Sequence, residues 1–122
     1  MKPSNNGDPA TESQSEQTAR IRMLNDRLRK GGQGGWLCIS NGIVMLGHEA
    51  SLIIREAIAS FDQFGPDNDP YNEHDFGAIE FAGERILWKI DYYDKNETYA
   101  SPDPADPSVT TRILTIMLAS EY

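Results

Sequence analysis

The sequence predicts an α+β domain with a mostly antiparallel sheet of about four strands and with helices packed on one face. Two hairpin signals and three helical patterns indicate this class, in the order α-ββα-ββα. The chain has 122 residues, of which 39% are hydrophobic, which suffices for one core but not for two ordinary domains. We therefore expect a disordered polar lead over residues 1–12 and a single domain over residues 13–122.

The first helix is expected to span about residues 14–30. Ser13 and Glu16 match the S-x-x-E capping box, and apolar residues then recur at helical spacing. Basic residues including Arg29 stand near its end, where they complement the helix dipole and require no ligand to explain them.

Two further helices are predicted downstream. Between Glu49 and Phe64 apolar residues recur every three or four positions, and Gly65-Pro66 then ends the pattern. The last helix is expected to begin at Asp106-Pro107, with an N-cap and a proline in the first turn. The β-branched residues of TTRILTIML leave a strand as the alternative for this segment.

The strongest strand signal is a hairpin around Ala82-Gly83-Glu84, because apolar and other residues alternate on both sides of it. A second hairpin is predicted around Asn41-Gly42, a dipeptide suited to a two-residue turn. The glycines of residues 31–35 are interpreted as a hinge or turn. A phosphate-binding loop requires Lys and Ser or Thr after the glycines, and here Trp36-Leu37 follow.

Charge and cysteine content narrow the class of protein. The formal net charge of -8 disfavours direct binding to nucleic acid or to anionic lipid. No apolar run approaches the roughly 18 residues of a membrane span, and no signal-peptide core is present. The single cysteine, Cys38, excludes an internal disulfide and fits a reducing compartment. We expect a cytoplasmic protein.

More than half of the carboxylates fall within residues 62–75 and 91–106, which are predicted to be loops at neighbouring ends of one hairpin. They are Asp62, Asp67, Asp69, Glu73, Asp75, Asp91, Asp94, Glu97, Asp103 and Asp106. Carboxylates at this density repel one another, so we expect a cation to compensate them. Three interpretations are open: a metal ion, a catalytic role, or basic groups from a partner or from within the chain.

A metal site has limited support in the spacing of these residues. The segment from Asp67 lacks the glycine and the final glutamate of an EF-hand loop, which leaves an irregular oxygen site from Asp67, Asp69, Glu73 and Asp75 as an open alternative. A zinc site is disfavoured because Cys38, His48 and His74 lack paired-ligand spacing. We expect no cofactor.

Catalysis is the second alternative. His74, between Glu73 and Asp75, has the composition of an oriented general base, but a loop histidine bonded to backbone is the simpler interpretation. Residues 75–77 spell the kinase triplet DFG without the motifs that accompany it. Cys38 is interpreted as a small core residue rather than as a nucleophile. The residues favour a non-enzymatic protein over an enzyme.

The third alternative is that the carboxylates meet basic groups. Arg112, Lys89 and Arg85 are candidates for internal neutralisation. Tyrosines interleaved with the acids suit contact with Lys- and Arg-rich protein surfaces. The predicted binding residues are Asp67, Asp69, Tyr71, Glu73, Asp75, Asp91, Tyr93 and Asp94.

The segments NDPYNEHDFG, WKIDYYD and SPDPADPSVTTRILTIMLASEY resemble the family of small bacterial proteins of unknown function catalogued as DUF3768, over roughly residues 18–122. The resemblance implies no activity, fold or catalytic residue, because none is established for the family. Such proteins look like passengers of plasmids and other mobile elements, among accessory and anti-restriction-type genes. This context favours an anti-defence or regulatory binding role by association.

These observations together predict a non-enzymatic acidic protein-binding module. Its expected partner is a basic protein surface, such as that of a nucleic-acid-handling host protein, which it would inhibit in the manner of an anti-CRISPR or anti-restriction protein. The alternative is a small metal-dependent hydrolase that uses the acidic-loop carboxylates with His74. The sequence makes no prediction of the oligomeric state.

Overall fold

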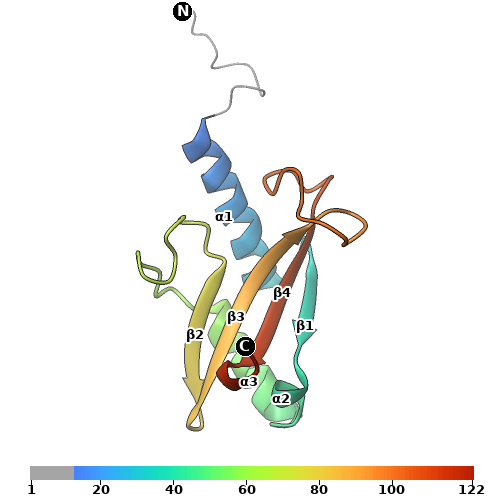
Figure 1. The fold of residues 1–122 in the computed structure, drawn as a ribbon. Helices are drawn as coiled ribbons and strands as arrows, with labels where there is room; N and C mark the ends of the chain where they lie inside the picture. Colours follow the sequence, from blue (N-terminus) through green and yellow to red (C-terminus); the bar gives the residue numbers. More distant parts are fainter. Residues whose placement is uncertain (1–12) are drawn as a thin grey trace, which may run out of the picture.

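The computed structural model describes residues 13–122, and the predicted disordered lead, residues 1–12, lies outside the described residues. The chain forms helices and one four-stranded sheet (Figure 1). The helices are α1 (Gln14–Gly31), α2 (Asn41–Val44) and α3 (His48–Ala59), with a final 3-10 turn, η3 (Ala119–Glu121). The strands are β1 (Trp36–Ile39), β2 (Phe76–Phe81), β3 (Glu84–Tyr93) and β4 (Thr111–Leu118).

The strand order in the sheet is β1-β4-β3-β2. β2 and β4 pair antiparallel with β3, whereas β1 runs parallel to β4. The α+β class and the four strands are therefore confirmed, but the sheet is mixed. The predicted order α-ββα-ββα is wrong, because the predicted hairpin at Asn41-Gly42 and the predicted C-terminal helix do not form.

The predicted hairpin at Asn41-Gly42 is replaced by the start of α2. Ser40 caps this helix, since its hydroxyl accepts a hydrogen bond from the Ile43 amide. The Gly42 amide donates to the Glu121 carboxylate, a partner 79 residues away in the chain. The helical turn therefore depends on a contact with the C-terminal segment that a local pattern does not reveal.

The predicted C-terminal helix is a strand, β4, as the β-branched residues of the alternative interpretation favoured. β4 lies between β1 and β3, and residues on both its faces are buried: Leu114 and Ile116 in the core beneath the helices, and Met117 on the opposite face. A strand covered on both faces loses the alternation of apolar and polar residues that identifies half-exposed strands. Its sequence thus resembles that of a buried helix.

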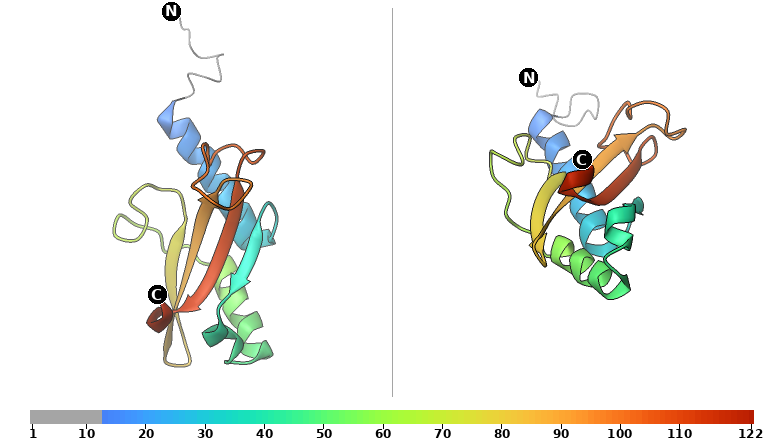
Figure 2. Two further views of the ribbon diagram at one scale, coloured as in Figure 1. Left: turned by 45° about the vertical axis from the view of Figure 1, so that its right-hand side comes forward. Right: turned by 60° about the horizontal axis from the view of Figure 1, so that its bottom comes forward.

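The main core lies between the sheet and helices α1 and α3, which cover the same face (Figures 1 and 2). Trp88 is fully buried at its centre, with Phe61 and Phe64 packed edge-on against its ring. The C-terminal turn η3 lies against the other face, where Leu87 and Met117 are buried. The prediction that helices pack on one face of the sheet is therefore confirmed for α1 and α3.

The hairpin β2–β3 is confirmed. Its two turn residues, Ala82 and Gly83, have φ values of 52° and 83°, the left-handed pair of a type I′ turn. The capping box of α1 is confirmed as well, with Ser13 and Glu16 bonded reciprocally. None of the helices described between residues 13 and 122 combines the length and apolar character needed to span a membrane.

Candidate functional site

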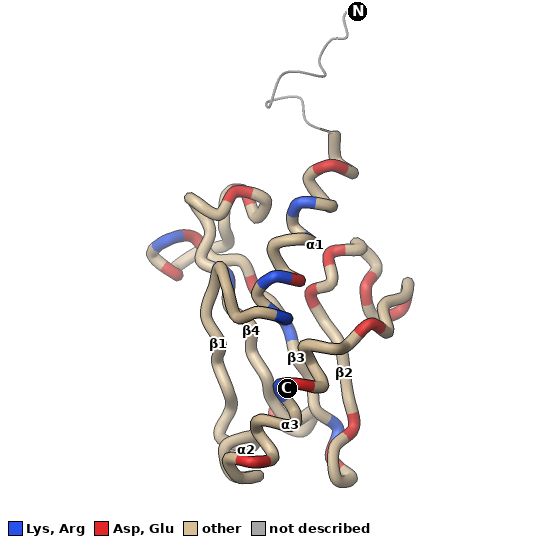
Figure 3. The backbone as a smooth tube through the Cα atoms, turned by 180° about the vertical axis from the view of Figure 1, so that it is seen from behind, with Lys and Arg blue, Asp and Glu red and all other residues tan. Residues whose placement is uncertain are grey.

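The two acidic segments emerge at the same end of the sheet, because β2 begins where its antiparallel neighbour β3 ends. One loop spans residues 62–75 and the other residues 94–110, and α1 runs between them (Figure 1). Acidic positions mark both loops in Figure 3. We call residues 62–75 the first acidic loop and residues 94–110 the second.

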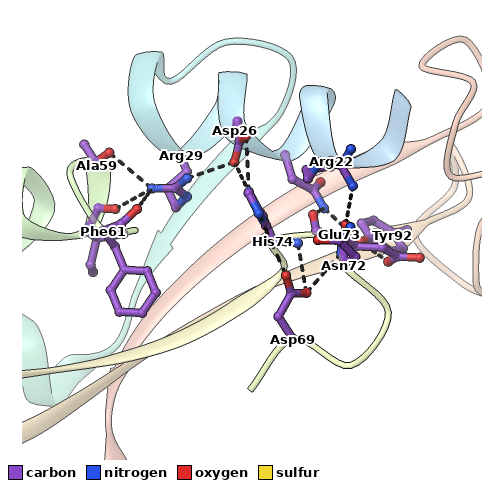
Figure 4. Close-up of polar contacts among 12 residues, drawn as sticks. Arg22, Asp26, Arg29, Ala59, Phe61, Asp69, Asn72, Glu73, His74 and Tyr92 are labelled. Carbon is purple, nitrogen blue, oxygen red and sulfur yellow. Dashed lines mark hydrogen bonds and ion pairs between the residues drawn. The ribbon is translucent and has the colours of Figure 1, made fainter. Parts of the chain in front are cut away.

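Asp69 organises the first acidic loop from inside. Its side chain is buried, and Oδ1 accepts hydrogen bonds from the amides of Glu73 (3.0 Å) and His74 (3.1 Å). These bonds hold a turn in which Asn72 and His74 have positive φ values. Arg22 of α1 donates to the Asn72 carbonyl at 2.8 Å (Figure 4). Asp69 therefore shapes the loop rather than facing a partner.

His74 is held by side chains on both sides. Its Nδ1 lies 2.9 Å from Asp26 Oδ1 and its Nε2 3.9 Å from Asp69 Oδ2, while the ring stacks on Phe64 at 3.8 Å. Burial alone would raise the pKa of Asp26, but hydrogen bonds from His74 and Arg29 lower it. The ionised Asp26 only accepts, so Nδ1–H of His74 donates. The orienting carboxylate is Asp26 and not Glu73 or Asp75.

Arg29 joins α1 to the end of α3. Its Nη1 donates to the carbonyls of Ile58, Ala59 and Phe61 at 2.9 to 3.1 Å, which satisfies the carbonyls at the end of that helix. Nη2 donates to Asp26 at 2.8 Å (Figure 4). The sequence interpretation of Arg29 as a dipole-complementing residue therefore missed its main role, which is to connect two helices.

A second polar chain runs beneath the loops through Tyr92. The Tyr92 hydroxyl donates to Glu73 Oε1 at 2.7 Å and accepts from Asn25 Nδ2 at 2.8 Å. Asn25 Oδ1 accepts from Arg112 Nε at 2.6 Å. Arg112 is buried and also donates to the Pro104 carbonyl in the second acidic loop. Arg112 thus bonds to neutral acceptors, and it reaches Glu73 only through Tyr92 and Asn25.

The sequence analysis did not identify Asn25 or the connecting role of Arg29, although a signal for both was present. Both fall in the stripe of α1 that carries the buried residues Ile21, Leu24 and Leu28. Polar residues inside an apolar stripe are buried with it and need hydrogen-bond partners. Here the partners come from Glu73, Tyr92 and the end of α3.

Asp75 is a partly buried carboxylate of the site that forms no ion pair among residues 13–122. Partial burial is the largest cause of its raised pKa, and repulsion from Glu73, Asp69 and Asp91 adds to it; the pKa of Asp75 is raised to about 6. Within residues 13–122 no ion pair joins Asp75 to a basic side chain. Perturbed carboxylates of this kind mark candidate functional sites.

The other predicted binding residues differ in their roles. Asp67 and Tyr71 are exposed on the first loop, with Tyr71 76% accessible. Asp91 is paired with Lys89 at 2.9 Å, and Asp94 Oδ1 accepts from the Thr98 amide and shapes the second loop. Tyr93 is half-buried. Of the proposed internal cations, Lys89 neutralises Asp91, whereas Arg85 pairs with Glu80 instead.

The residues do not fit a metal centre. Among residues 13–122, no three carboxylate, imidazole or thiol side chains are close enough together to hold a metal ion. Cys38 is exposed at the sheet edge, so its interpretation as a small core residue is wrong.

The fold and the site define a small α+β domain in which a buried polar network supports two acidic loops. A family model described as a protein of unknown function (DUF3768) matches residues 39–121, and the chain belongs to this family. The resemblance seen in the sequence is thereby confirmed. The match begins in β1 and contains both acidic loops. Comparison with curated proteins found no match, and comparison with solved structures found none.

Proposed function

We propose that this protein is a non-enzymatic acidic module that binds a basic protein surface through its first acidic loop. The observation that supports this most is Asp75, whose carboxylate is partly buried beside three other carboxylates without a cation from residues 13–122. Burying a charge without a partner costs free energy. A Lys or Arg from a partner would remove that cost and form a charge-assisted hydrogen bond.

The groups around Asp75 suit this role. Asp67 and Tyr71 are exposed on the same loop and offer a carboxylate and an aromatic ring to a basic surface. Asp69 fixes the loop from inside, so little conformational entropy is lost on binding. The partner we propose is a nucleic-acid-handling host protein, whose basic channel attracts carboxylates as it attracts phosphates. Binding would inhibit it, in an anti-CRISPR or anti-restriction manner.

The metal-dependent hydrolase has less support. His74 is stacked on Phe64 and paired with Asp26, so it is fixed as part of the loop scaffold. The carboxylates of the first acidic loop are directed to separate partners, as Asp69 bonds to backbone amides and Glu73 to Tyr92. We therefore propose binding alone.

The test compares three immobilised proteins in capture from bacterial lysate at low and high salt. They are the native chain, the Asp67→Asn/Asp75→Asn variant, and the control Glu80→Gln/Glu84→Gln, which removes two exposed charges at the hairpin end of the sheet. The native chain and the control should retain the same basic protein, identified by mass spectrometry, and high salt should release it. The loop variant should not retain it.

A second measurement uses the purified partner. The native chain should displace nucleic acid from it, and the Asp67→Asn/Asp75→Asn variant should do so much less. Equal retention by the loop variant and the control would contradict the proposed role of the first acidic loop, as would a captured partner that still binds its nucleic acid normally.

A further inference from the structure

The chain segment at the β1 edge of the molecule differs from the acidic end in containing no charged residue. Residues 31–47 contain none of the Asp, Glu, Lys and Arg residues that make up 25% of the chain. In Figure 3, β1 is tan along its whole length. Exposed large apolar side chains are concentrated in this segment and in the adjoining part of α3: Trp36, Leu37, Val44, Met45, Leu52 and Ile53. Grouped exposed apolar residues indicate an interface.

Part of this surface is concave. A groove of about 520 Å³ lies between the end of α1, one side of α3 and β1. Leu37 and Leu52 line it and remain 38% and 49% exposed. Arg55 and Glu56 of α3 line the same groove, so both charge signs are present at its margin.

The strand beside this groove has an edge that no strand among residues 13–122 occupies. Within that range β1 pairs with β4 alone, and the Ser40 amide just after it donates to the Ile116 carbonyl. Successive residues of a strand direct their backbone polar groups to opposite edges. The amides and carbonyls of Leu37 and Ile39 therefore point away from β4, to the open side. An unpaired edge of this kind is a template for another strand.

We propose that two copies of this chain associate through β1, paired antiparallel about a two-fold axis at Cys38. In this register Leu37 of each copy exchanges backbone hydrogen bonds with Ile39 of the other, and all outward-facing groups of the strand are used. Leu37 and Ile39 lie together on the helix side, which extends the apolar groove across the axis. The two sheets become one continuous sheet.

The edge of β1 complements itself, which favours a second copy over an unrelated partner. About the axis at Cys38 the outward-facing amide and carbonyl of Leu37 meet those of Ile39 of the other copy, and the segment on both sides of the seam is the same uncharged one, residues 31–47. A surface that complements itself in this way is characteristic of isologous dimers.

The same axis also separates the net charges. It lies perpendicular to the sheet, so the acidic loops of the two copies point to opposite ends of the joined sheet. The formal charge of -8 on each chain is then kept away from the seam, where residues 31–47 are uncharged. The dimer leaves the first acidic loop of each copy accessible, and the inference does not depend on the proposed function.

Cys38 provides a direct test, because it is exposed and is the one cysteine of the chain. Mild oxidation in air with copper phenanthroline should link the native chain into a disulfide dimer rapidly, since two Cys38 residues face each other across the axis. The control Cys38→Ser/Thr98→Cys carries an exposed thiol in the second acidic loop, far from the axis. It should link at least tenfold more slowly.

Light scattering during size-exclusion chromatography supplies the second readout. The reduced native chain should have twice the mass of one copy, and Leu37→Lys, which places a charge on the free edge, should be monomeric with an unchanged circular dichroism spectrum. A monomeric native chain, equal linking of Cys38 and the control, or a Leu37→Lys dimer would overturn the inference.

Discussion

The Arg112 guanidinium lies over the Tyr92 ring, with its carbon 5.0 Å from the ring centroid. Tyr92 in turn donates its hydroxyl proton to Glu73 at the base of the first acidic loop. Arg112 also bonds to Asn25 of α1 and to the Pro104 carbonyl of the second loop. A single buried cation on β4 therefore connects α1 and both loops, and this network can be tested residue by residue.

Removing the Tyr92 hydroxyl should destabilise the fold. Tyr92→Phe deletes the hydrogen bonds to Glu73 and from Asn25 in a partly buried environment. We expect the free energy of unfolding to fall by about 1–3 kcal/mol, measured by urea denaturation. Tyr99→Phe is the control, because Tyr99 is 74% exposed and its change should have little effect. Equal stability of both variants would show that the network does not stabilise the protein.

A methyl group at Gly77 should disturb the core. A Cβ there would lie 2.5 Å from Nε1 of Trp88, whose ring is fully buried and cannot retreat. Gly77→Ala should lower the free energy of unfolding by about 1–3 kcal/mol and shift the tryptophan emission. Gly31→Ala is the matched control, since nothing lies within 4 Å of its added Cβ. Equal free energies of unfolding for Gly77→Ala and Gly31→Ala would contradict the described packing of Trp88.

Neutralising Asp75 should stabilise the protein at neutral pH. Its folded-state pKa of about 6 exceeds the ordinary 3.8, so the folded state binds the extra proton and stability falls as pH rises from about 4 to 6. Asp75→Asn should remove this loss. After allowance for solvent screening we expect a gain of about 1 kcal/mol at pH 7.

The gain from Asp75→Asn should be small near pH 4, where the folded-state carboxyl is protonated and the pH is close to the unfolded-state pKa of 3.8. Thermal denaturation of the native chain and the variant at pH 4 and pH 7 gives the comparison. Asp67→Asn, an exposed carboxylate of the same loop, is the control. A gain that is equal at both pH values would contradict the raised pKa.

Glu121 should hold the C-terminal turn against α2. Its carboxylate accepts from the Ser40 hydroxyl at 2.6 Å, the Leu118 amide at 2.7 Å and the Gly42 amide at 2.9 Å. Glu121→Ala should therefore speed hydrogen exchange of the Gly42 and Leu118 amides. Hydrogen bonds from Ser40 and Leu118 lower the pKa of Glu121, so its carboxylate stays ionised below the ordinary pKa. Protection of the two amides in the native chain should therefore be present at neutral pH and be lost only in stronger acid. Exchange in the Glu121→Ala variant should lack this acid-induced loss.

Local patterns predicted the parts of the fold that depend on local interactions. The capping box at Ser13 and the turn at Ala82-Gly83 each involve residues within three positions of one another. The Asn41-Gly42 pattern was misinterpreted because its outcome depends on Glu121, which is remote in sequence. β4 was misinterpreted because residues on both its faces are buried, and that burial depends on helices and loops that are remote in sequence.

The site was predicted in part for the same reason. The sequence located both acidic loops and the exposed pair Asp67 and Tyr71. No sequence pattern distinguished the buried Asp69 from the exposed Asp67, which lies two positions before it. That difference arises from the turn that Asp69 itself stabilises, and pairing such as that of His74 with Asp26 spans 48 residues.

The position of β4 in the middle of the sheet constrains when this protein can fold during its synthesis. β1 emerges from the ribosome early, but its parallel partner is made 77 residues later, as in the pair Trp36 and Ile113. Until residues 111–118 have left the exit tunnel, β1 has no neighbour and β3 lacks one of its two partners. The sheet therefore assembles after translation of β4 rather than along with it. A nascent chain stalled before this strand would expose an unpaired β1 and one edge of β3 to chaperones and proteases.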